Sequence, residues 1–108
     1  MRGKKILFDQ GTPVPLRRHL HPRPVDTAAE MGWATLGNGD LLAAAEQAGF
    51  AILVTTDQNL RYQQNLAQRK IAVVVLTTTS WPRIRQKILE VAVAIDGLPP
   101  GGFAEVSI

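Results

Sequence analysis

Runs of consecutive apolar residues alternate along the chain with segments of helical spacing. Residues 51–54 and 71–76 are apolar at every position, which is typical of strands that are buried on both faces of a parallel sheet. Residues 4–8 predict a first strand, and residues 25–28 predict a short one. A last strand is expected at residues 103–108, on an edge of the sheet.

Helices are predicted between these runs. Pro13 and Pro15 suit the first turn of a helix that ends near residue 20, because proline is tolerated there. Residues 41–48 have helical spacing after a turn at Asn38-Gly39, and Gly49 follows as a stop signal. Residues 60–68 predict another helix. Ser80 reads as the N-cap of a final helix, whose inward positions are Ile84, Ile88, Val91 and Ile95.

Strands that alternate with helices indicate βαβ units. We therefore expect a three-layer α/β/α fold with a mostly parallel sheet of four or five strands. At 108 residues, the chain has the length of one domain with a real core. A single domain over residues 1–108 is the expectation.

Composition narrows the function classes. The chain contains no cysteine, which excludes disulfides, thiolate metal sites and a cysteine nucleophile. No segment has the roughly 20 apolar residues that a membrane span requires, and the apolar stretch near the start is too short for a signal peptide. A soluble, cytoplasmic protein that does not bind membranes is expected. The net charge of +3 is compatible with a polyanionic partner.

Two of the predicted strands end on an aspartate. Asp9 follows residues 4–8, and Asp57 follows residues 51–54 after Thr55 and another threonine. Ligands of parallel α/β sheets bind beyond the carboxyl ends of the strands, so neighbouring strands would bring these carboxylates together. Carboxylates that lie close together repel each other unless a cation neutralises them. Mg²⁺ or Mn²⁺ suits such oxygen ligands, and Asn59 is a further candidate ligand.

Two more acids are candidates for the same site. Asp40 opens the helix predicted at residues 41–48, and Glu30 follows the second strand. Each has a structural alternative. An acid in the first turn of a helix is stabilised by the helix dipole, and Glu30 is also compatible with a solvated surface position. Asp9 and Asp57 also have a structural alternative, since aspartate is common in turns.

At this point the sequence resembles a known family. The stretches KILFDQGTP, AEMGW, NGDLLAAAEQAGFAILVTTDQNL and IAVVVL are similar to those of PIN-like nuclease domains, in the compact branch often found in toxin–antitoxin pairs. The similar stretches span most of residues 4–76, and the part from residue 77 onward adds little.

The resemblance implies a metal-dependent endoribonuclease, the toxin of such a pair, with an antitoxin-like partner protein. Asp9, Asp40 and Asp57 would match the acidic metal-binding positions of the family. Thr55 would match the threonine of its Thr-x-Asp motif, and Glu30 a recurrent acidic position. Two residues depart from the pattern. Gln10 and Asn59 stand where relatives often carry acids, and each exchange removes a negative charge that would hold metal.

Basic residues supply candidate RNA contacts. Arg17 and Arg18 lie in the stretch RRHLHPR, and Arg61 follows the loop that carries Asp57. Phosphate groups of RNA are bound by such side chains. The alternative for Arg17 and Arg18 is a solvated helix face.

Two other function classes stay open. One is a degenerate nuclease fold that binds RNA or a protein without cutting it. The other is a receiver-type phosphoacceptor domain, which also has an aspartate after the third strand. Such a domain needs a lysine after its last parallel strand, and we expect its five-fold βα repeat to be incomplete here. A homodimer through an edge strand at residues 103–108 is also expected as a possibility.

Overall fold

The computed structural model describes residues 3–108 and contains a five-stranded sheet in the order β2-β1-β3-β4-β5. All four neighbouring pairs of strands are parallel, which confirms the predicted fold class. The strands are β1 (Ile6–Phe8), β2 (Val25–Thr27), β3 (Ile52–Thr55), β4 (Ala72–Leu76) and β5 (Phe103–Val106).

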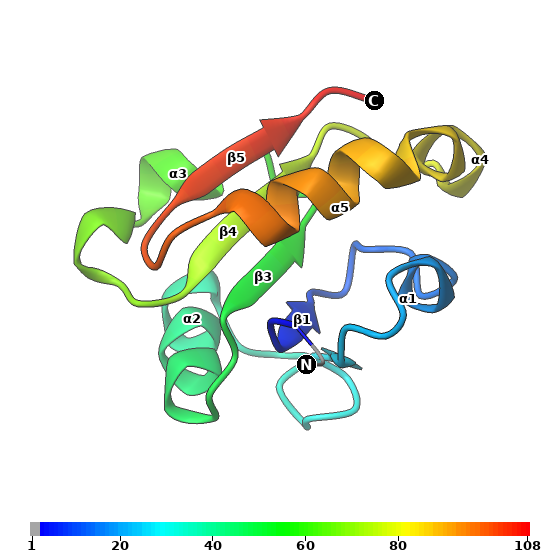
Figure 1. Cartoon of the computed structure of the whole chain (residues 1–108). Coiled ribbons are helices and arrows are strands. Elements are labelled where there is room, and N and C mark those ends of the chain that lie inside the picture. The colour runs from blue at the N-terminus through cyan, green and yellow to red at the C-terminus, as the bar shows by residue number, and fades with distance from the viewer. Residues whose placement is uncertain (1–2) are drawn as a thin grey trace.

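Helices cover both faces of this sheet (Figure 1). The helices on one face are α2 (Asn38–Gln47) and α3 (Leu60–Gln63), with the 3₁₀ turn η1 (Leu66–Gln68). The other face carries α1 (Leu16–His19), α4 (Trp81–Ile84) and α5 (Ile88–Gly97), and the 3₁₀ turn η2 (Arg85–Lys87) joins the last two.

Alternation along the strands divides the core into two layers. Leu7, Leu53 and Val73 pack under α2, whereas Phe8, Val54 and Val74 pack under α1 and α5. Because successive side chains of a strand point to opposite faces, a strand that is covered on both sides must be apolar at every position. This is why residues 51–54 and 71–76 lack the polar alternation of a half-exposed sheet.

Two local predictions are wrong. Asn38 and Gly39 are the first two residues of α2 rather than a turn, and Gly37 is its N-cap. The helix predicted at residues 60–68 is interrupted at Gln64, whose backbone is extended. The side chain of Asn65 accepts a hydrogen bond from the Ala67 N–H at 3.1 Å. Asparagine competes in this way with helical backbone bonds, so η1 starts anew.

The predicted helix after Ser80 is confirmed, with Ser80 as the N-cap residue of α4. The single helix expected from the inward positions is divided into α4, η2 and α5, although Ile84, Val91 and Ile95 are fully buried as expected. The edge strand predicted at residues 103–108 is also confirmed, as β5. It is parallel to β4, so all five strands are parallel. Within residues 3–108 no helix follows β5, so the βα repeat lacks its fifth helix there.

Two lysines lie at the amino edge of the sheet, where the parallel strands begin, and bind the C-terminal ends of two helices. Lys4 Nζ donates to the carbonyl of Ile95 at 3.0 Å and also to that of Leu98, at the end of α5. Lys5 Nζ donates to the carbonyl of Ala48 at 3.2 Å, at the end of α2. Adjacent residues point to opposite faces, so each lysine reaches one helix layer. Both neutralise the negative end of a helix dipole and satisfy carbonyls that lack helical partners.

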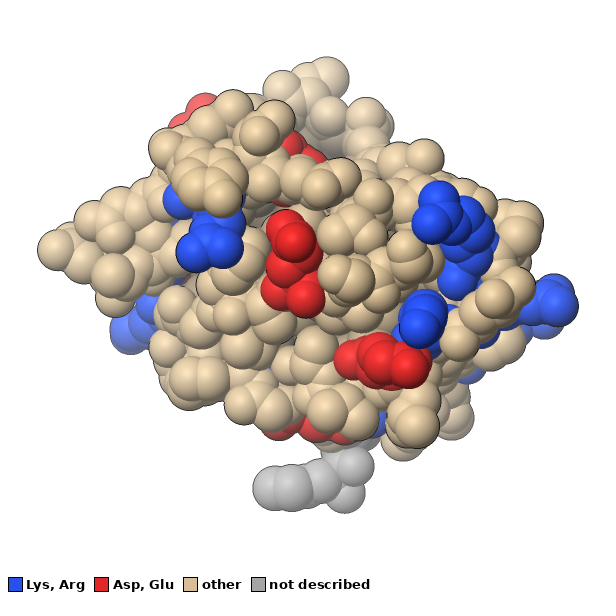
Figure 2. Space-filling model, turned by 90° about the horizontal axis from the view of Figure 1, so that it is seen from above, with Lys and Arg blue, Asp and Glu red and all other residues tan. Residues whose placement is uncertain are grey.

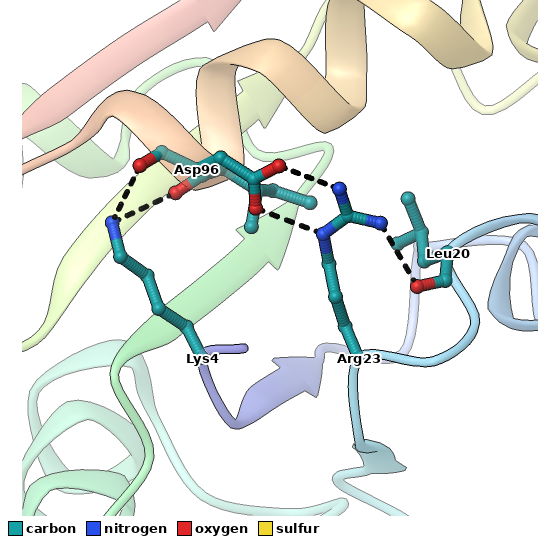
Figure 3. Close-up of polar contacts among 5 residues, drawn as sticks. Lys4, Leu20, Arg23 and Asp96 are labelled. Carbon is teal, nitrogen blue, oxygen red and sulfur yellow. Dashed lines mark hydrogen bonds and ion pairs between the residues drawn. The ribbon is translucent and has the colours of Figure 1, made fainter. Parts of the chain in front are cut away.

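At the same edge, an ion pair joins α5 to the loop before β2 (Figure 3). The guanidinium of Arg23 donates to both carboxylate oxygens of Asp96, with Nε at 2.8 Å from Oδ1, and Nη1 donates to the Leu20 carbonyl at 3.1 Å. The hydrogen bond from Arg23 lowers the pKa of Asp96, although partial burial opposes this. We call Lys4, Arg23 and Asp96 the amino-edge cluster.

Within residues 3–108, no helix is both long and apolar enough to cross a membrane.

Candidate functional site

The strand order reverses between β1 and β3. The chain passes from β1 to β2 on one side and then returns to β3 on the other side of β1. Ligands of open parallel sheets bind at such a reversal, beyond the carboxyl ends of the strands. Asp9 directly follows β1, and Thr55 is the last residue of β3, so both lie at this point.

Asp9 is held by both neighbouring segments. Its N–H donates to the Val54 carbonyl of β3 at 3.1 Å. The Thr55 hydroxyl donates to Asp9 Oδ2, and the Thr12 hydroxyl lies 2.8 Å from Asp9 Oδ1 and 2.8 Å from the Val54 carbonyl. Thr12 and Thr55 are both buried, so the orientation of the carboxylate is fixed from two sides.

Thr55 connects Asp9 to Asp57. The oxygen that donates to Asp9 also accepts a hydrogen bond from the Asp57 N–H at 3.0 Å. Asp57 Oδ1 in turn accepts from the Asn59 N–H at 2.9 Å, which is the bond of an Asx-turn. The two aspartates predicted at neighbouring strand ends therefore belong to one hydrogen-bonded unit, and Thr55 occupies its centre.

Asn38 belongs to this unit, although the sequence predicts only a turn residue at this position. Its side-chain amide donates to Asp57 Oδ2 at 2.9 Å and lies 3.5 Å from Gln63 Oε1. As the first residue of α2, it brings the positive end of that helix toward the carboxylate. Its position two residues before Asp40 is the only signal in the sequence that relates it to the site.

Gly11 is required by the close packing of the loop after β1. A Cβ at this position would lie 2.3 Å from Thr56 Oγ1 and 3.8 Å from Asp9 Oδ1. The first distance is far below van der Waals contact, so a side chain here would require the Thr56 hydroxyl to move. Gly11 therefore allows the Thr56 side chain to pack closely against the loop that carries Asp9.

Burial raises the pKa of Asp9 above its ordinary value, and hydrogen bonds from Thr55, Thr12 and the backbone of residues 11 and 12 offset part of the rise. Among residues 3–108, the three ion pairs are Arg17–Glu30, Arg23–Asp96 and Arg69–Glu46. None includes Asp9 or Asp57. A carboxylate that is removed from water and has no basic partner favours a cation or a proton.

The third predicted ligand is not joined to this unit. Asp40 lies in the first turn of α2 with an exposed side chain, and no hydrogen bond links it to Asp9 or Asp57. Within residues 3–108, no group of three or more His, Asp or Glu side chains is arranged to hold a metal. The convergence of Asp9, Asp40 and Asp57 that the family resemblance implies is therefore not seen.

Glu30 has a structural partner. Its carboxylate makes a two-point ion pair with Arg17, with Oε1 at 2.6 Å from Nη2, and Oε1 also accepts from the Thr27 N–H at 2.9 Å. The hydrogen bond from Arg17 lowers the pKa of Glu30. Glu30, a predicted supporting residue, and Arg17, a predicted RNA contact, thus bind each other beside the carboxyl end of β2.

The remaining predicted residues differ in position. Gln10 and Asn59 are exposed next to Asp9 and Asp57, where neutral oxygens are available to a ligand. Arg61 points elsewhere, because its guanidinium carbon lies 4.6 Å from the ring centroid of Phe103, the first residue of β5. Arg61 therefore extends toward the amino end of β5 rather than toward Asp57.

A basic cavity lies between α1 and β2. Its volume is about 890 Å³, and its lining includes Arg17, Arg18, His21 and Arg23 beside valine and proline side chains. Arg18 is exposed, and no ion pair or hydrogen bond engages it among the described residues. Viewed from above the orientation of Figure 1, acidic side chains lie in separate patches, and Lys and Arg side chains gather toward both sides (Figure 2).

The residues at the strand reversal fit one divalent cation. Two carboxylates, with amide and hydroxyl oxygens around them, suit Mg²⁺ or Mn²⁺, which retain several waters and need few protein ligands. All four carboxylate oxygens of Asp9 and Asp57 already accept a hydrogen bond. Each oxygen keeps a second lone pair for a metal, so these bonds orient the ligands without excluding an ion.

No family model matches the chain, and searches of curated proteins and of solved structures likewise give no match.

Proposed function

We propose that the protein is a metal-dependent RNA phosphodiesterase of PIN-like type, with Asp9 and Asp57 as ligands of Mg²⁺ or Mn²⁺. The observation that carries the proposal is the Asp9–Thr55–Asp57 unit at the strand reversal, where Asp9 is partly buried with a raised pKa and has no basic partner among residues 3–108. Buried carboxylates are normally paired with a cation, whereas the hydrogen bonds to the Asp9 carboxylate come from hydroxyl and backbone groups.

The cation, when bound, supplies activation of water and neutralisation of charge on the phosphoryl group. The residues of the chain hold it in place. Thr55 and Thr12 fix the carboxylate of Asp9, and Asn38 and the Asn59 N–H fix that of Asp57. Such supporting hydrogen bonds set ligand orientation and metal affinity. With two acidic ligands rather than three, we expect one weakly held ion.

RNA is the proposed substrate because a basic cavity lies between α1 and β2, the strand next to β1. Arg18 and His21 of this cavity supply contacts for phosphates. The valines and prolines of the cavity offer apolar contacts for bases. If the protein acts as a toxin, a cognate antitoxin-like protein would restrain this activity, and that part of the proposal rests on the family resemblance alone.

The test combines metal binding with cleavage. Mn²⁺ is expected to raise the melting temperature of the wild type, and a fluorescent single-stranded RNA is expected to be cut only with Mg²⁺ or Mn²⁺. Asp9→Asn and Asp57→Asn should lose both effects, whereas Glu90→Gln, an exposed change on α5, should keep them. RNA binding that is insensitive to chelators, without cleavage, would instead establish a degenerate binding module.

A phosphoacceptor domain is a second candidate, favoured by the strand order. The order β2-β1-β3-β4-β5 is also that of flavodoxin-like and receiver-type sheets, and Asp57 follows β3 as a phosphoacceptor would. The two residues after β5 are Ser107 and Ile108, so the lysine of that class is not found there. Acetyl phosphate with Mg²⁺, followed by intact-mass measurement, distinguishes the candidates, because only this one predicts a covalent phosphoryl adduct.

A further inference from the structure

β5 has an open hydrogen-bonding edge. It pairs only with β4, and the Val73 N–H donates to the Gly102 carbonyl at 3.0 Å. In a parallel ladder, alternate residues face the neighbouring strand, so the backbone groups of Phe103, Glu105 and Ser107 face outward. Within the described residues, no hydrogen bond engages these outward N–H and C=O groups.

The opposite edge of the sheet is covered at its carboxyl end. Thr27 of β2 directs its backbone outward, but its N–H donates to Glu30 Oε1 at 2.9 Å and its C=O accepts from the Met31 N–H at 3.1 Å. The loop after β2 thus covers its own edge, as natural proteins commonly do to prevent unwanted strand pairing. Within residues 3–108, no such hydrogen bonds cover the edge of β5.

An apolar groove lies along the open edge, between β5 and α5, which are adjacent in Figure 1. It has a volume of about 480 Å³, and its lining includes Leu89, Val93, Ala104 and Val106. Leu89 and Val93 are one helical turn apart and are 74% and 63% exposed. They extend the apolar surface of the sheet beyond its last strand, where side chains of an added strand would lie.

The charge of the groove limits what it can bind. Glu90 and Glu105 are its charged lining residues, and none of the lining residues is Lys, Arg or His. This acidic region is found in a chain with a net charge of +3. A second copy of the chain would bring the same two carboxylates to the contact, and pairing centred on Glu105 would place like charges directly opposite each other, which is destabilising.

We propose that the edge of β5 binds an extended segment of a partner protein, which adds a sixth strand to the sheet. The segment has apolar residues at alternate positions, which pack on Leu89 and Val93, and Lys or Arg among the others, which lie on the opposite face of the sheet with Glu105. Backbone hydrogen bonds to residues 103, 105 and 107 provide affinity, and the side chains provide specificity. The proposal does not depend on the chemistry at Asp9 and Asp57.

Amide hydrogen exchange followed by NMR tests this directly. The probe is an acetylated and amidated peptide of alternating valine and lysine, and the matched control replaces every lysine with glutamate. An added strand is expected to slow exchange at the Phe103, Glu105 and Ser107 amides by about tenfold or more at saturation. The Ala104 and Val106 amides already face β4 and should change much less.

Variants make the test specific to the groove. Leu89→Ser with Val93→Ser should abolish the protection, and Glu105→Lys should reverse the preference between the two peptides. Val14→Ser removes a side chain that is 54% exposed in the cavity beside α1. It should leave the amide protection of residues 103, 105 and 107 by the peptide unchanged. All of these side chains are exposed, so the variants should fold normally.

Three results would overturn the proposal. The first is no change at residues 103, 105 and 107 with excess valine–lysine peptide, and the second is equal protection by both peptides. The third is protection of these amides without peptide in a concentration-dependent dimer, which would make a second copy the occupant.

Discussion

The two ends of the parallel strands, the amino edge and the carboxyl edge of the sheet, differ in how their charged side chains are paired. At the amino edge, Lys4 and Lys5 donate to carbonyls at the ends of α5 and α2, and Arg23 pairs with Asp96. At the carboxyl edge, Asp9 accepts hydrogen bonds from neutral hydroxyls, and no cationic side chain of the described residues pairs with it. At the amino edge, the charged side chains are therefore paired with groups of the protein. At the carboxyl edge, the carboxylate of Asp9 is bonded by neutral groups.

The two regions also differ in the direction in which their carboxylate pKa values are shifted. The pKa of Asp96 is lowered, chiefly by the hydrogen bond from Arg23, and that of Asp9 is raised by burial. A carboxylate whose pKa is raised destabilises the folded protein when it ionises. Groups of this kind are concentrated at functional sites. We therefore interpret the carboxyl edge as a site that an external cation completes.

The largest expected effect is functional. Asp9→Asn should reduce Mn²⁺ affinity and RNA cleavage by about 100-fold or more, since a metal ligand contributes several kcal/mol. It should not destabilise the metal-free protein at neutral pH, because it removes a buried charge. Isothermal titration and urea unfolding measure the two quantities. A variant that loses stability but keeps metal affinity would assign Asp9 to the same class as Asp96.

At the amino edge the expected effect is on stability. Lys4→Met should lower the free energy of unfolding by about 1–2 kcal/mol, because carbonyls at the end of α5 lose a charged donor while the apolar stem is kept. RNA cleavage at a temperature where the variant is folded should match the wild type. A loss of activity without a loss of stability would contradict the separation of the two edges.

A supporting residue should have an intermediate effect. Asn38→Ala removes the amide that donates to Asp57 Oδ2 and should weaken Mn²⁺ binding by about tenfold. Asn38→Asp is the informative companion, because it adds a carboxylate at the same place. Stronger Mn²⁺ binding by Asn38→Asp than by Asn38→Ala is expected, and the reverse order would show that the amide does not orient a metal ligand.

The two aspartates should respond to pH with opposite signs. The raised pKa of Asp9 means that its contribution to folding is fully present below about pH 4, the unfolded value, and is lost as pH rises through its folded pKa. The lowered pKa of Asp96 means that its contribution is present above about pH 4 and is lost as pH falls through its folded pKa.

Urea unfolding of the metal-free protein at several pH values measures these contributions. Asp9→Asn should gain stability relative to the wild type as pH rises above about 4. Asp96→Asn should be less stable than the wild type at neutral pH, by about 1 kcal/mol or less because the pair is partly exposed, and the difference should vanish at low pH. Parallel curves for both variants would refute the comparison.

The smallest expected effect is that of Asp40→Asn. The side chain is exposed and unattached to the site, so the free energy of unfolding should change by less than about 0.5 kcal/mol. Metal affinity should change by no more than about threefold. A loss as large as that of Asp9→Asn would show that the family pattern describes the bound state better than the geometry of this structure does.

The sequence predicted the layers and the positions of Asp9 and Asp57 because both depend on strong local signals. An apolar run that is buried on both faces is unambiguous in residues 71–76, and the carboxyl end of a parallel strand has a fixed place in the fold. The strand order and the direction of β5 are set by crossover connections and by packing, which leave no local pattern.

The rest of the site depends on contacts between distant residues. The pair Asn-Gly predicts a turn at Asn38. In the structure Asn38 begins α2, and its side chain reaches Asp57. Thr12 follows Asp9 by three residues and is buried, which a loop sequence does not indicate. Arg61 adjoins the Asp57 loop in sequence, yet it extends toward Phe103, a residue whose position depends on how β5 joins the sheet.

The most direct test of the cation site is the anomalous signal of a crystal grown or soaked with Mn²⁺. The account predicts one peak at the strand reversal, with oxygens of Asp9 and Asp57 at about 2.1–2.2 Å from the ion and water as its remaining ligands. A peak that is coordinated by other side chains, or no peak at this edge at millimolar Mn²⁺, would contradict it.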